Sequence, residues 1–465
     1  MKKSLMAALF AGTLFFASCD QEVVIDDAQL QEIVDAAVAA ALQNYPNTQA
    51  IADAAAAAAT QAVNSGIASL DINGAIQAAL DAADAIANPE VVNVGTGGIL
   101  EITTNTTWTN DKIWFMSGKV VVKSGATLTI EEGTIVKAAG GQGSNATVLL
   151  VAQGGKINAV GTAAKPIIFT DFQDQITYAH GGVSPNRSLG DRGKWGCIVV
   201  LGKAKVGEDG GTEDIEGITS GFDFTVYGGS DDADNSGVLK YVSIRHTGTQ
   251  VAGGDELQGL TMGGVGSGTV IDNVELLGSN DDGIEIFGGS VNVTNLVVYG
   301  HKDDGIDLDE AYKGTISNAL IYMAADSDTA FEIDGTEDGT GTIKGEYTVQ
   351  NVTVYGNLDA EKTATLGDYK AGPTGLNKNI AYVDFKDGSG YKGIDAGKYG
   401  GAGTATAVDK LFFNSVVFVG GSANTKATVL NGKASEDSAT WLSIASAKAS
   451  TAGADESVFG WTQVK

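Results

Sequence analysis

The sequence predicts an all-β protein, a right-handed parallel β-helix preceded by an Ala-rich α-helical stalk. Two observations favour the β-helix: segments about 22 residues apart repeat one pattern, and each repeat contains short apolar-polar-apolar strands. The composition agrees, since 64 Gly but only 5 Pro among 465 residues indicate many strands joined by tight turns. An antiparallel β-sandwich would show hairpin signals rather than a repeat that keeps its register.

The repeat is clearest in the middle of the chain. Residues 272–289 and 294–311 follow the same pattern, and Asp281 and Asp303 stand 22 positions apart in it. Their strands, with that of the next repeat, read Ile284-Glu285-Ile286, Ile306-Asp307-Leu308 and Phe331-Glu332-Ile333. Because successive side chains of a strand point to opposite faces, we expect the apolar members to point inward and the polar members to face solvent. One coil cannot bury its apolar side, but a stack of coils can.

The first residues, 1–19, indicate a lipoprotein signal. Lys2 and Lys3 precede an apolar run from Leu5 to Phe16, which is too short to span a bilayer and is typical of a cleaved signal. Cys19 directly follows small residues, which resembles the lipobox of bacterial lipoproteins. That resemblance implies that Cys19 is lipidated and that the chain is anchored to the outer membrane, where we expect it on the cell surface.

The remainder divides into three predicted regions. Residues 20–91 carry apolar and Ala residues at helical spacing, which predicts a helical stalk that lifts the body from the membrane. Residues 92–358 form the predicted β-helix. Residues 359–465 add further coils, a Gly-rich loop and a cap, in which we expect Phe459 and Trp461 to cover the open end of the stack.

Charge and cysteine content narrow the classes of function. The chain has 57 acidic and 29 basic residues, a net charge of −28, which disfavours binding to nucleic acid. Cys197 is the only other cysteine and lies in an apolar run, so we expect a buried, unreactive thiol and no disulfide. The three histidines are scattered along the chain, which disfavours a zinc site.

The acidic residues of the repeats are the candidate site. Glu285, Asp307 and Glu332 should stack outward on three successive coils, and stacked carboxylates repel one another unless a cation relieves them. Ca²⁺ takes six to eight oxygen ligands, which neighbouring coils could supply. The alternative is that these side chains accept hydrogen bonds from turn amides and stay solvated. The candidate metal ligands are Asp281, Asp282, Glu285, Asp303, Asp304, Asp307, Asp309 and Glu332.

Several segments together also resemble a known family. Residues 118–138, 161–170, 193–204 and 227–244, read in this order, are similar to the secreted β-helix lipoproteins of Gram-negative bacteria. The resemblance covers residues 95–358 and extends more distantly to the pectate-lyase-like superfamily. It implies the parallel β-helix fold, but it implies no reaction, because this lipoprotein group has no established enzymatic activity.

Two classes of function stay open. The first is a non-catalytic binding or structural role on the cell surface, in contact with a glycan, the matrix or a partner protein, with the membrane reached through the N-terminal lipid. The second is a polysaccharide lyase or glycoside hydrolase acting on an acidic polysaccharide through the Asp ladder. Paired carboxylates alone are weak evidence for catalysis. Aromatic side chains on which sugar rings could stack are Tyr299, Tyr312, Tyr322 and Tyr355. The alternative is that these tyrosines serve only in packing.

Overall fold

The computed structural model describes residues 88–207, 211–219, 221–251, 257–336, 345–357, 362–394, 399–402, 411–420, 424–431 and 439–464. Cys19 and nearly all of the predicted stalk lie outside these residues, and strand β1 (Glu90–Val94) begins where the stalk was expected to end. The chain forms two compact units, of which the larger comprises Val92–Asp174 and Arg187–Lys465. In the part of the smaller unit that is described, Thr177 caps a short 3-10 turn, η3 (Tyr178–His180). None of the described helices is long and apolar enough to cross a membrane.

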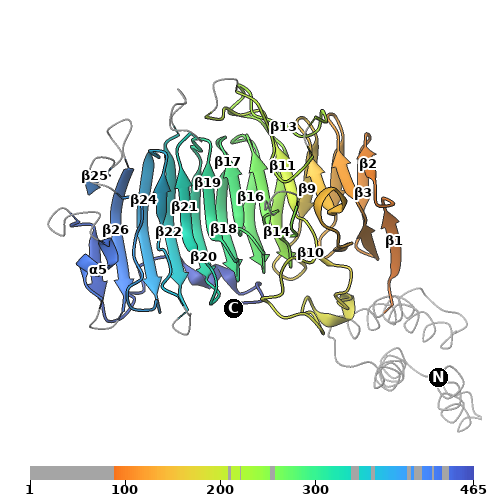
Figure 1. Ribbon diagram of the computed structural model, residues 1–465. Helices are drawn as coiled ribbons and strands as arrows, with labels where there is room; N and C mark the ends of the chain where they lie inside the picture. The colour runs from red at the N-terminus through yellow and green to blue at the C-terminus, as the bar shows by residue number, and fades with distance from the viewer. Residues whose placement is uncertain are drawn as a thin grey trace, which may run out of the picture. The chain divides into compact units, whose positions relative to one another are not determined.

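Parallel strands of successive coils pair to form two long sheets along the stack (Figure 1). The longer sheet runs in the order β1, β4 (Lys112–Met116), β7 (Ile135–Ala138), β10 (Ile167–Asp171), β14 (Gly237–Arg245), β16 (Val270–Leu277), β18 (Asn292–Tyr299), β20 (Thr315–Tyr322), β22 (Tyr347–Tyr355), β24 (Gly375–Val383), β26 (Leu411–Val419) and β25 (Tyr399–Ala402), with β27 (Leu442–Ala445) also paired to β26. The second sheet runs β2 (Ile99–Ile102), β5 (Lys119–Val122), β8 (Val148–Val151), β11 (Ile198–Leu201), β15 (Leu260–Gly263), β17 (Ile284–Phe287), β19 (Asp304–Asp309), β21 (Thr329–Asp334) and β23 (Asp368–Lys370). The predicted parallel β-helix is therefore confirmed.

The early coils have three strands each, and the later coils fuse two of them. The third strands are β3 (Thr106–Trp108), β6 (Thr127–Ile130) and β9 (Lys156–Val160). In β14, Gly237–Lys240 pair with β9 and Val242–Ile244 pair with β10. Tyr241 between them has a φ of +49°, which bends the strand. Each later long strand bends likewise, at a left-handed residue that is usually Asn, the side chain that best tolerates this conformation after Gly.

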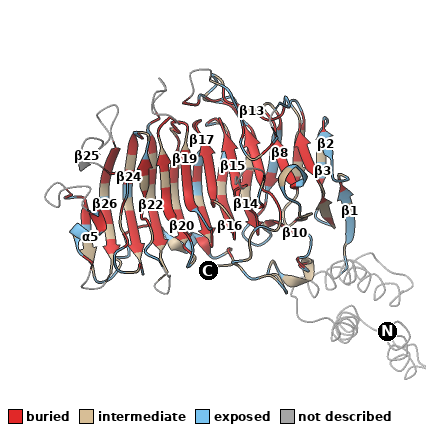
Figure 2. Cartoon of the chain, in the orientation of Figure 1, coloured by how far each residue is buried: buried red, intermediate tan, exposed pale blue. Residues whose placement is uncertain are grey.

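Most residues of the two long sheets are buried (Figure 2), and apolar side chains stack inside the coils from one coil to the next. Ile284 pairs with Ile306, which pairs with Phe331, and all three are fully buried. Leu260, one coil earlier, pairs with Ile284, so the column continues through this coil. The inward stacking expected from the repeats is thus correct. Removing methylenes from such a column would leave cavities that neighbouring coils cannot fill.

The polar side of the second sheet differs from expectation. Part of it is covered by residues 204–228, here called the covering segment, which carries β12 (Glu213–Asp214) and β13 (Val226–Tyr227) and is described except at 208–210 and 220. Its apolar side chains form a second core with outward-facing residues of the sheet, among them Val206, Ile215, Ile218, Phe224, Tyr227, Leu150, Val199 and Phe287. The polar strand residues were expected to face solvent, and this is wrong wherever the covering segment lies over them. In Figure 1 this segment lies above β11 and β17, at the position of label β13.

The C-terminal end also departs from the prediction. Phe459 is fully buried, but it packs on Val297 and Leu320, which point outward from the longer sheet. Trp461 packs edge-on against Tyr241 of β14. These two aromatic residues therefore cover a side of the stack, not its end, because residues 446–464 run back along the longer sheet (Figure 1). In the described part, the last coil is completed by β27 and by α5 (Lys426–Leu430), whose Val429 and Leu430 are buried.

Candidate metal centre

A single outward column of side chains crosses the second sheet and changes character along it. Strand register aligns, in order, Glu101, Val121, Leu150, Val199, Thr261, Glu285, Asp307, Glu332 and Asp368. The column is apolar where the covering segment packs most of its own apolar residues, and acidic on the last four coils. The predicted stacking of Glu285, Asp307 and Glu332 is therefore confirmed. Neighbouring members stand about 4.8 Å apart, the spacing of paired strands.

The acidic members differ in how their charge is balanced. Glu332 forms an ion pair with Lys370, and Asp368 lies 4.0 Å from the ammonium of Lys392. Within the described residues, no lysine, arginine or histidine nitrogen lies within ion-pair distance of Glu285 or Asp307. The two central carboxyl groups are thus the members of this acidic run without a basic partner.

Carboxylate oxygens gather around these two residues in three overlapping groups. In each group, one oxygen from every member lies within 4.8 Å of the others. The groups are Glu285 with Asp307 and Asp309, Asp282 with Asp304 and Asp307, and Asp281 with Asp282 and Asp303. The first two share Asp307, and the last two share Asp282. The structure therefore brings seven of the eight predicted ligands together, whereas Glu332 is taken by Lys370.

The carboxyl groups at the centre of the cluster are buried and incompletely hydrogen-bonded. Glu285, Asp304 and Asp307 are 5%, 4% and 7% exposed. One oxygen of each (Oε2, Oδ1 and Oδ1 respectively) is buried and accepts no hydrogen bond from the described residues. Asp282 is better satisfied, since its Oδ1 accepts from the Asp304 amide at 2.9 Å. Leaving a buried polar oxygen unpaired costs on the order of 1–3 kcal/mol, so a hydrogen-bond donor, a bound proton or a cation at these oxygens would stabilise the fold.

Burial and mutual repulsion set the protonation of the cluster. Burial, followed by the charge of neighbouring carboxylates, raises the pKa of Glu285, Asp282 and Asp307 well above the usual range. The same causes raise the pKa of Asp304 and of Asp309 to about 8. Without a cation, these groups hold protons that ordinary carboxyl groups release. A bound cation would reverse the effect, because it stabilises the ionised forms.

The covering segment contributes polar groups that the sequence did not indicate. Glu216 accepts a hydrogen bond from Gln258 Nε2 at 3.1 Å, and Gln258 Oε1 accepts one from Thr261 Oγ1 at 2.6 Å. The Glu216 carboxylate is near enough to raise the pKa of both Glu285 and Asp309. It lies in an insertion without repeat pattern, so no periodicity could place it. Asp334, by contrast, could have been found from the repeat. It stands two residues after Glu332, just as Asp309 stands two residues after Asp307.

The tyrosines considered as sugar platforms have other roles. Tyr312 is buried, and its hydroxyl donates to the carbonyl of Val291 at 2.6 Å. Tyr322 and Tyr355 stack face to face with centroids 4.8 Å apart, and Tyr299 adjoins Tyr322 at 5.9 Å. A sugar ring stacks on an open aromatic face, and the facing surfaces of Tyr322 and Tyr355 cover each other. This arrangement favours a role of these tyrosines in packing along the stack over a role in binding sugar.

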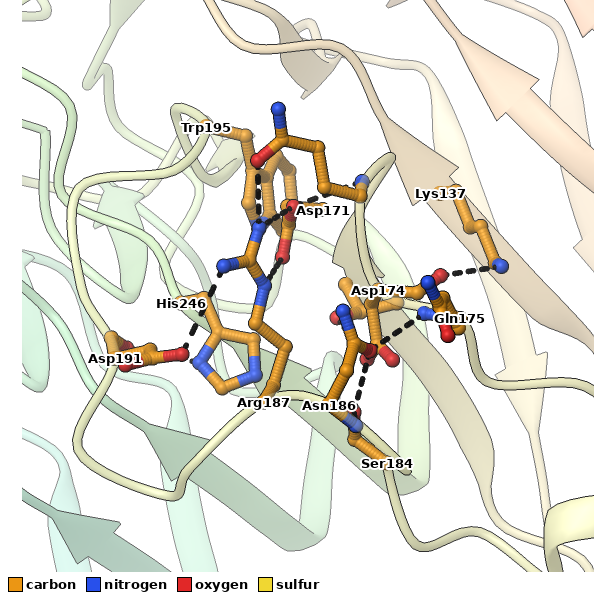
Figure 3. Close-up of polar contacts among 12 residues, drawn as sticks. Lys137, Asp171, Asp174, Gln175, Ser184, Asn186, Arg187, Asp191, Trp195 and His246 are labelled. Carbon is orange, nitrogen blue, oxygen red and sulfur yellow. Dashed lines mark hydrogen bonds and ion pairs between the residues drawn. The ribbon is translucent and has the colours of Figure 1, made fainter.

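Another buried carboxylate shows how the chain satisfies such a group with its own residues. Asp171 is 1% exposed, and Arg187 Nε donates to its Oδ2 at 2.8 Å (Figure 3). Beside this pair, a ring nitrogen of His246 lies 2.8 Å from the carbonyl oxygen of Asp191, and Trp195 Nε1 donates to the carbonyl of Arg245. Cys197 is fully buried and its pKa is raised to about 12 by burial, so the expected unreactive thiol is confirmed. Among the described residues, Glu285 and Asp307 of the acidic cluster have no basic partner that corresponds to Arg187.

Stacked parallel coils with columns of like side chains define a parallel β-helix protein. A family model described as a pectate-lyase like beta helix domain matches residues 100–464. The chain therefore belongs to this β-helix family, which confirms the superfamily fold that the sequence resemblance implied. No curated protein and no solved structure matched the chain. Membership of this family establishes the fold of the chain. It does not establish a metal site or a cellular role, which have to be argued from individual residues.

Proposed function

We propose that this chain is a lipid-anchored, cell-surface β-helix protein with a non-catalytic binding or structural role, stabilised by Ca²⁺ held in the acidic cluster. One observation carries the metal proposal: Glu285 and Asp307 are buried with unpaired oxygens, while Glu332 and Asp368 in the same column have lysine partners. Leaving an uncompensated charge in a protein interior costs several kcal/mol.

The chemistry of the donors favours Ca²⁺. All are carboxylate oxygens, the ligands of hard cations, with no thiol or imidazole among the three groups. Ca²⁺ binds oxygens at about 2.3–2.6 Å, so ligands on opposite sides of the ion stand up to about 5 Å apart. Within each of the three groups the oxygens lie within 4.8 Å of one another, close enough for one such ion to contact all three. Mg²⁺ would demand shorter, octahedral contacts and usually keeps several of its waters.

The anchor and the location rest on the N-terminal sequence. Cys19, after a basic and then an apolar stretch, supports lipidation and display at the outer membrane surface. A rod of stacked coils offers a long, acidic surface to a glycan, matrix component or partner protein. Burial of the central carboxyl groups, those of Glu285, Asp304 and Asp307, favours a structural role for them over contact with a polymeric substrate.

Calcium binding and melting temperature test the proposal directly. We expect the chelator-treated full chain to bind Ca²⁺ in calorimetry, and millimolar Ca²⁺ to raise its melting temperature by at least about 3 °C. Asp307→Asn keeps the shape but removes the shared ligand, so this variant should melt higher than the wild type without metal and gain little from Ca²⁺. A variant with a damaged fold would melt lower than the wild type both without metal and with Ca²⁺, so damage would not produce this result.

Asp368→Asn is the matched control, because Asp368 stands in the same column but beside Lys392. This variant should keep the full response to Ca²⁺. The absence of bound metal and of any melting shift at millimolar Ca²⁺ would refute the metal centre. Chelator-sensitive release of reducing or unsaturated sugars from an acidic polysaccharide, lost in the double variant Asp303→Ala and Asp304→Ala, would replace the non-catalytic role with the enzymatic alternative.

A further inference from the structure

A second feature of the second sheet's outer side lies at its opposite end, at Lys119 of β5. Val120 and Val122 point into the core, so Lys119 and Val121 point outward. Lys119 is nevertheless only 9% exposed, since the covering segment and the turn η2 (Gly143–Asn145) lie over it. Within the part of the chain that the structure describes, its Nζ donates one hydrogen bond, to the carbonyl of Ser144 at 2.6 Å.

Lys119 has no acidic partner among the described residues, in a chain with 57 acidic residues. Lys123, four residues further on, shows the usual arrangement: its Nζ lies 2.7 Å from Asp223 and 3.3 Å from Glu101. An ammonium group has three donor hydrogens, and one carbonyl satisfies only one of them. Burial also lowers the pKa of Lys119. A buried ammonium in this state calls for an anion.

A cavity adjoins this ammonium. It has a volume of about 190 Å³. Its walls combine the polar groups of Lys119, Ser144 and Thr219 with apolar side chains, namely Ala146, Val148, Ile218 and Val251. Sites for drug-sized ligands enclose roughly 300–1,000 Å³, so this cavity admits only a small molecule. One positive group beside an apolar wall selects a small anion with an apolar body.

We propose that this cavity binds a small organic carboxylate, which pairs with Lys119 Nζ and places its apolar part against Val148 and Ile218. The ion pair would use the free donor hydrogens of the ammonium and offset the cost of its burial. This site lies on β5 and β8, away from the acidic cluster on β17 and β19. It goes beyond the proposed calcium-stabilised role and can fail without affecting it.

Ligand-observed NMR with propionate and benzoate tests the site on the full chain. Their amides, propionamide and benzamide, have nearly the same shape without the charge. We expect both carboxylates to bind and both amides to bind at least tenfold more weakly. In Lys119→Met, which retains the length of the side chain without its charge, the dissociation constant for propionate should rise at least tenfold. Lys156→Met, at an exposed lysine of β9, should leave it unchanged.

A second readout covers the case in which Lys119→Met does not fold. The rate at which an amine-reactive reagent modifies Lys119, measured on its peptide by mass spectrometry, should fall with propionate and not with propionamide. No carboxylate binding at about 10 mM would overturn the proposal. Equal binding of acids and amides, unchanged affinity in Lys119→Met, or binding of inorganic phosphate alone would overturn it as well.

Discussion

Asn318 and Asp455 exchange two hydrogen bonds although they stand 137 residues apart in the sequence. The Asp455 amide donates to Asn318 Oδ1 at 2.7 Å, and Asn318 Nδ2 donates to the Asp455 carbonyl at 3.3 Å. Asn379 holds Gly453 in the same way, at 3.0 and 3.1 Å. Two of the left-handed Asn residues that bend the long strands, Asn318 and Asn379, therefore also bind the C-terminal tail. The tail is thus held on the sheet by hydrogen bonds to side-chain amides instead of by pairing with a strand.

This docking predicts that the tail is held by Asn318 and released without unfolding the coils. Asn318→Gly tolerates the φ of +60° but lacks the amide, so we expect a loss of about 1–2 kcal/mol in stability of the docked tail. Hydrogen exchange at the Asp455 amide should accelerate accordingly. Asn273→Gly is the control, since Asn273 has a φ of +56° and, among the described residues, its amide bonds only to Asp272. Equal acceleration in both variants would contradict this account.

The sequence predicted the interior of the stack well because the interior repeats. Ile284, Ile306 and Phe331 recur at coil spacing, and each pairs with the next as expected. The same pattern identified Asp281, Asp282, Asp303 and Asp304 as neighbours, which is confirmed by the cluster of their oxygens. A solenoid makes contacts between coils regular, so a periodic sequence determines them.

Features without a period could not be predicted in this way. Phe459 is apolar, which indicates burial, but composition does not say against which surface it packs. Glu216 and Tyr227 lie in an insertion, and only the folded chain shows that it covers the outer side of β11 to β17. Glu216 of this insertion lies near Glu285, and both Glu285 and Asp307 are buried instead of solvated.

The bends predict a stabilising substitution at Ser415 of β26. Ser415 has a φ of +58° and is exposed, whereas the corresponding residue of the preceding strand is Asn379. Asn tolerates the left-handed conformation better than Ser, so Ser415→Asn should stabilise the protein by about 0.5–1 kcal/mol. Chemical denaturation measures the difference. Ser415→Val should instead destabilise, since a β-branched residue is strained there, and the opposite order of the two variants would contradict the prediction.

The buried pair of Asp171 and Arg187 predicts a large loss when one partner is removed. Arg187→Met leaves the buried Asp171 carboxylate unpaired, which should cost about 3–5 kcal/mol in the free energy of unfolding. Lys165→Met is the control, because the ion pair of Lys165 with Glu132 is exposed and should contribute about 1 kcal/mol or less. Similar losses in the two variants, measured by urea denaturation, would argue against a special role for the buried pair.

The acidic cluster predicts an unusual dependence of stability on pH. Carboxyl groups whose folded pKa is depressed stabilise a protein as pH rises, but here burial and neighbouring charges raise the pKa of Asp304 and Asp309 from 3.8 to about 8. The folded chain then binds more protons than the unfolded chain between about pH 4 and pH 8, so stability is greatest below this window and falls across it. Each such group contributes up to about 1.4 kcal/mol per pH unit.

In chelator, the melting temperature should therefore decline between pH 5 and pH 8, and Ca²⁺ should restore much of the loss at pH 8 because it stabilises the ionised carboxylates. General repulsion in a chain of net charge −28 also grows with pH, so variants must separate the two effects. Asp307→Asn should flatten the decline, since one shared charge leaves the cluster. Glu346→Gln, at an exposed position, should leave it unchanged. A melting temperature that stays constant or rises across this range in chelator would contradict the assigned protonation.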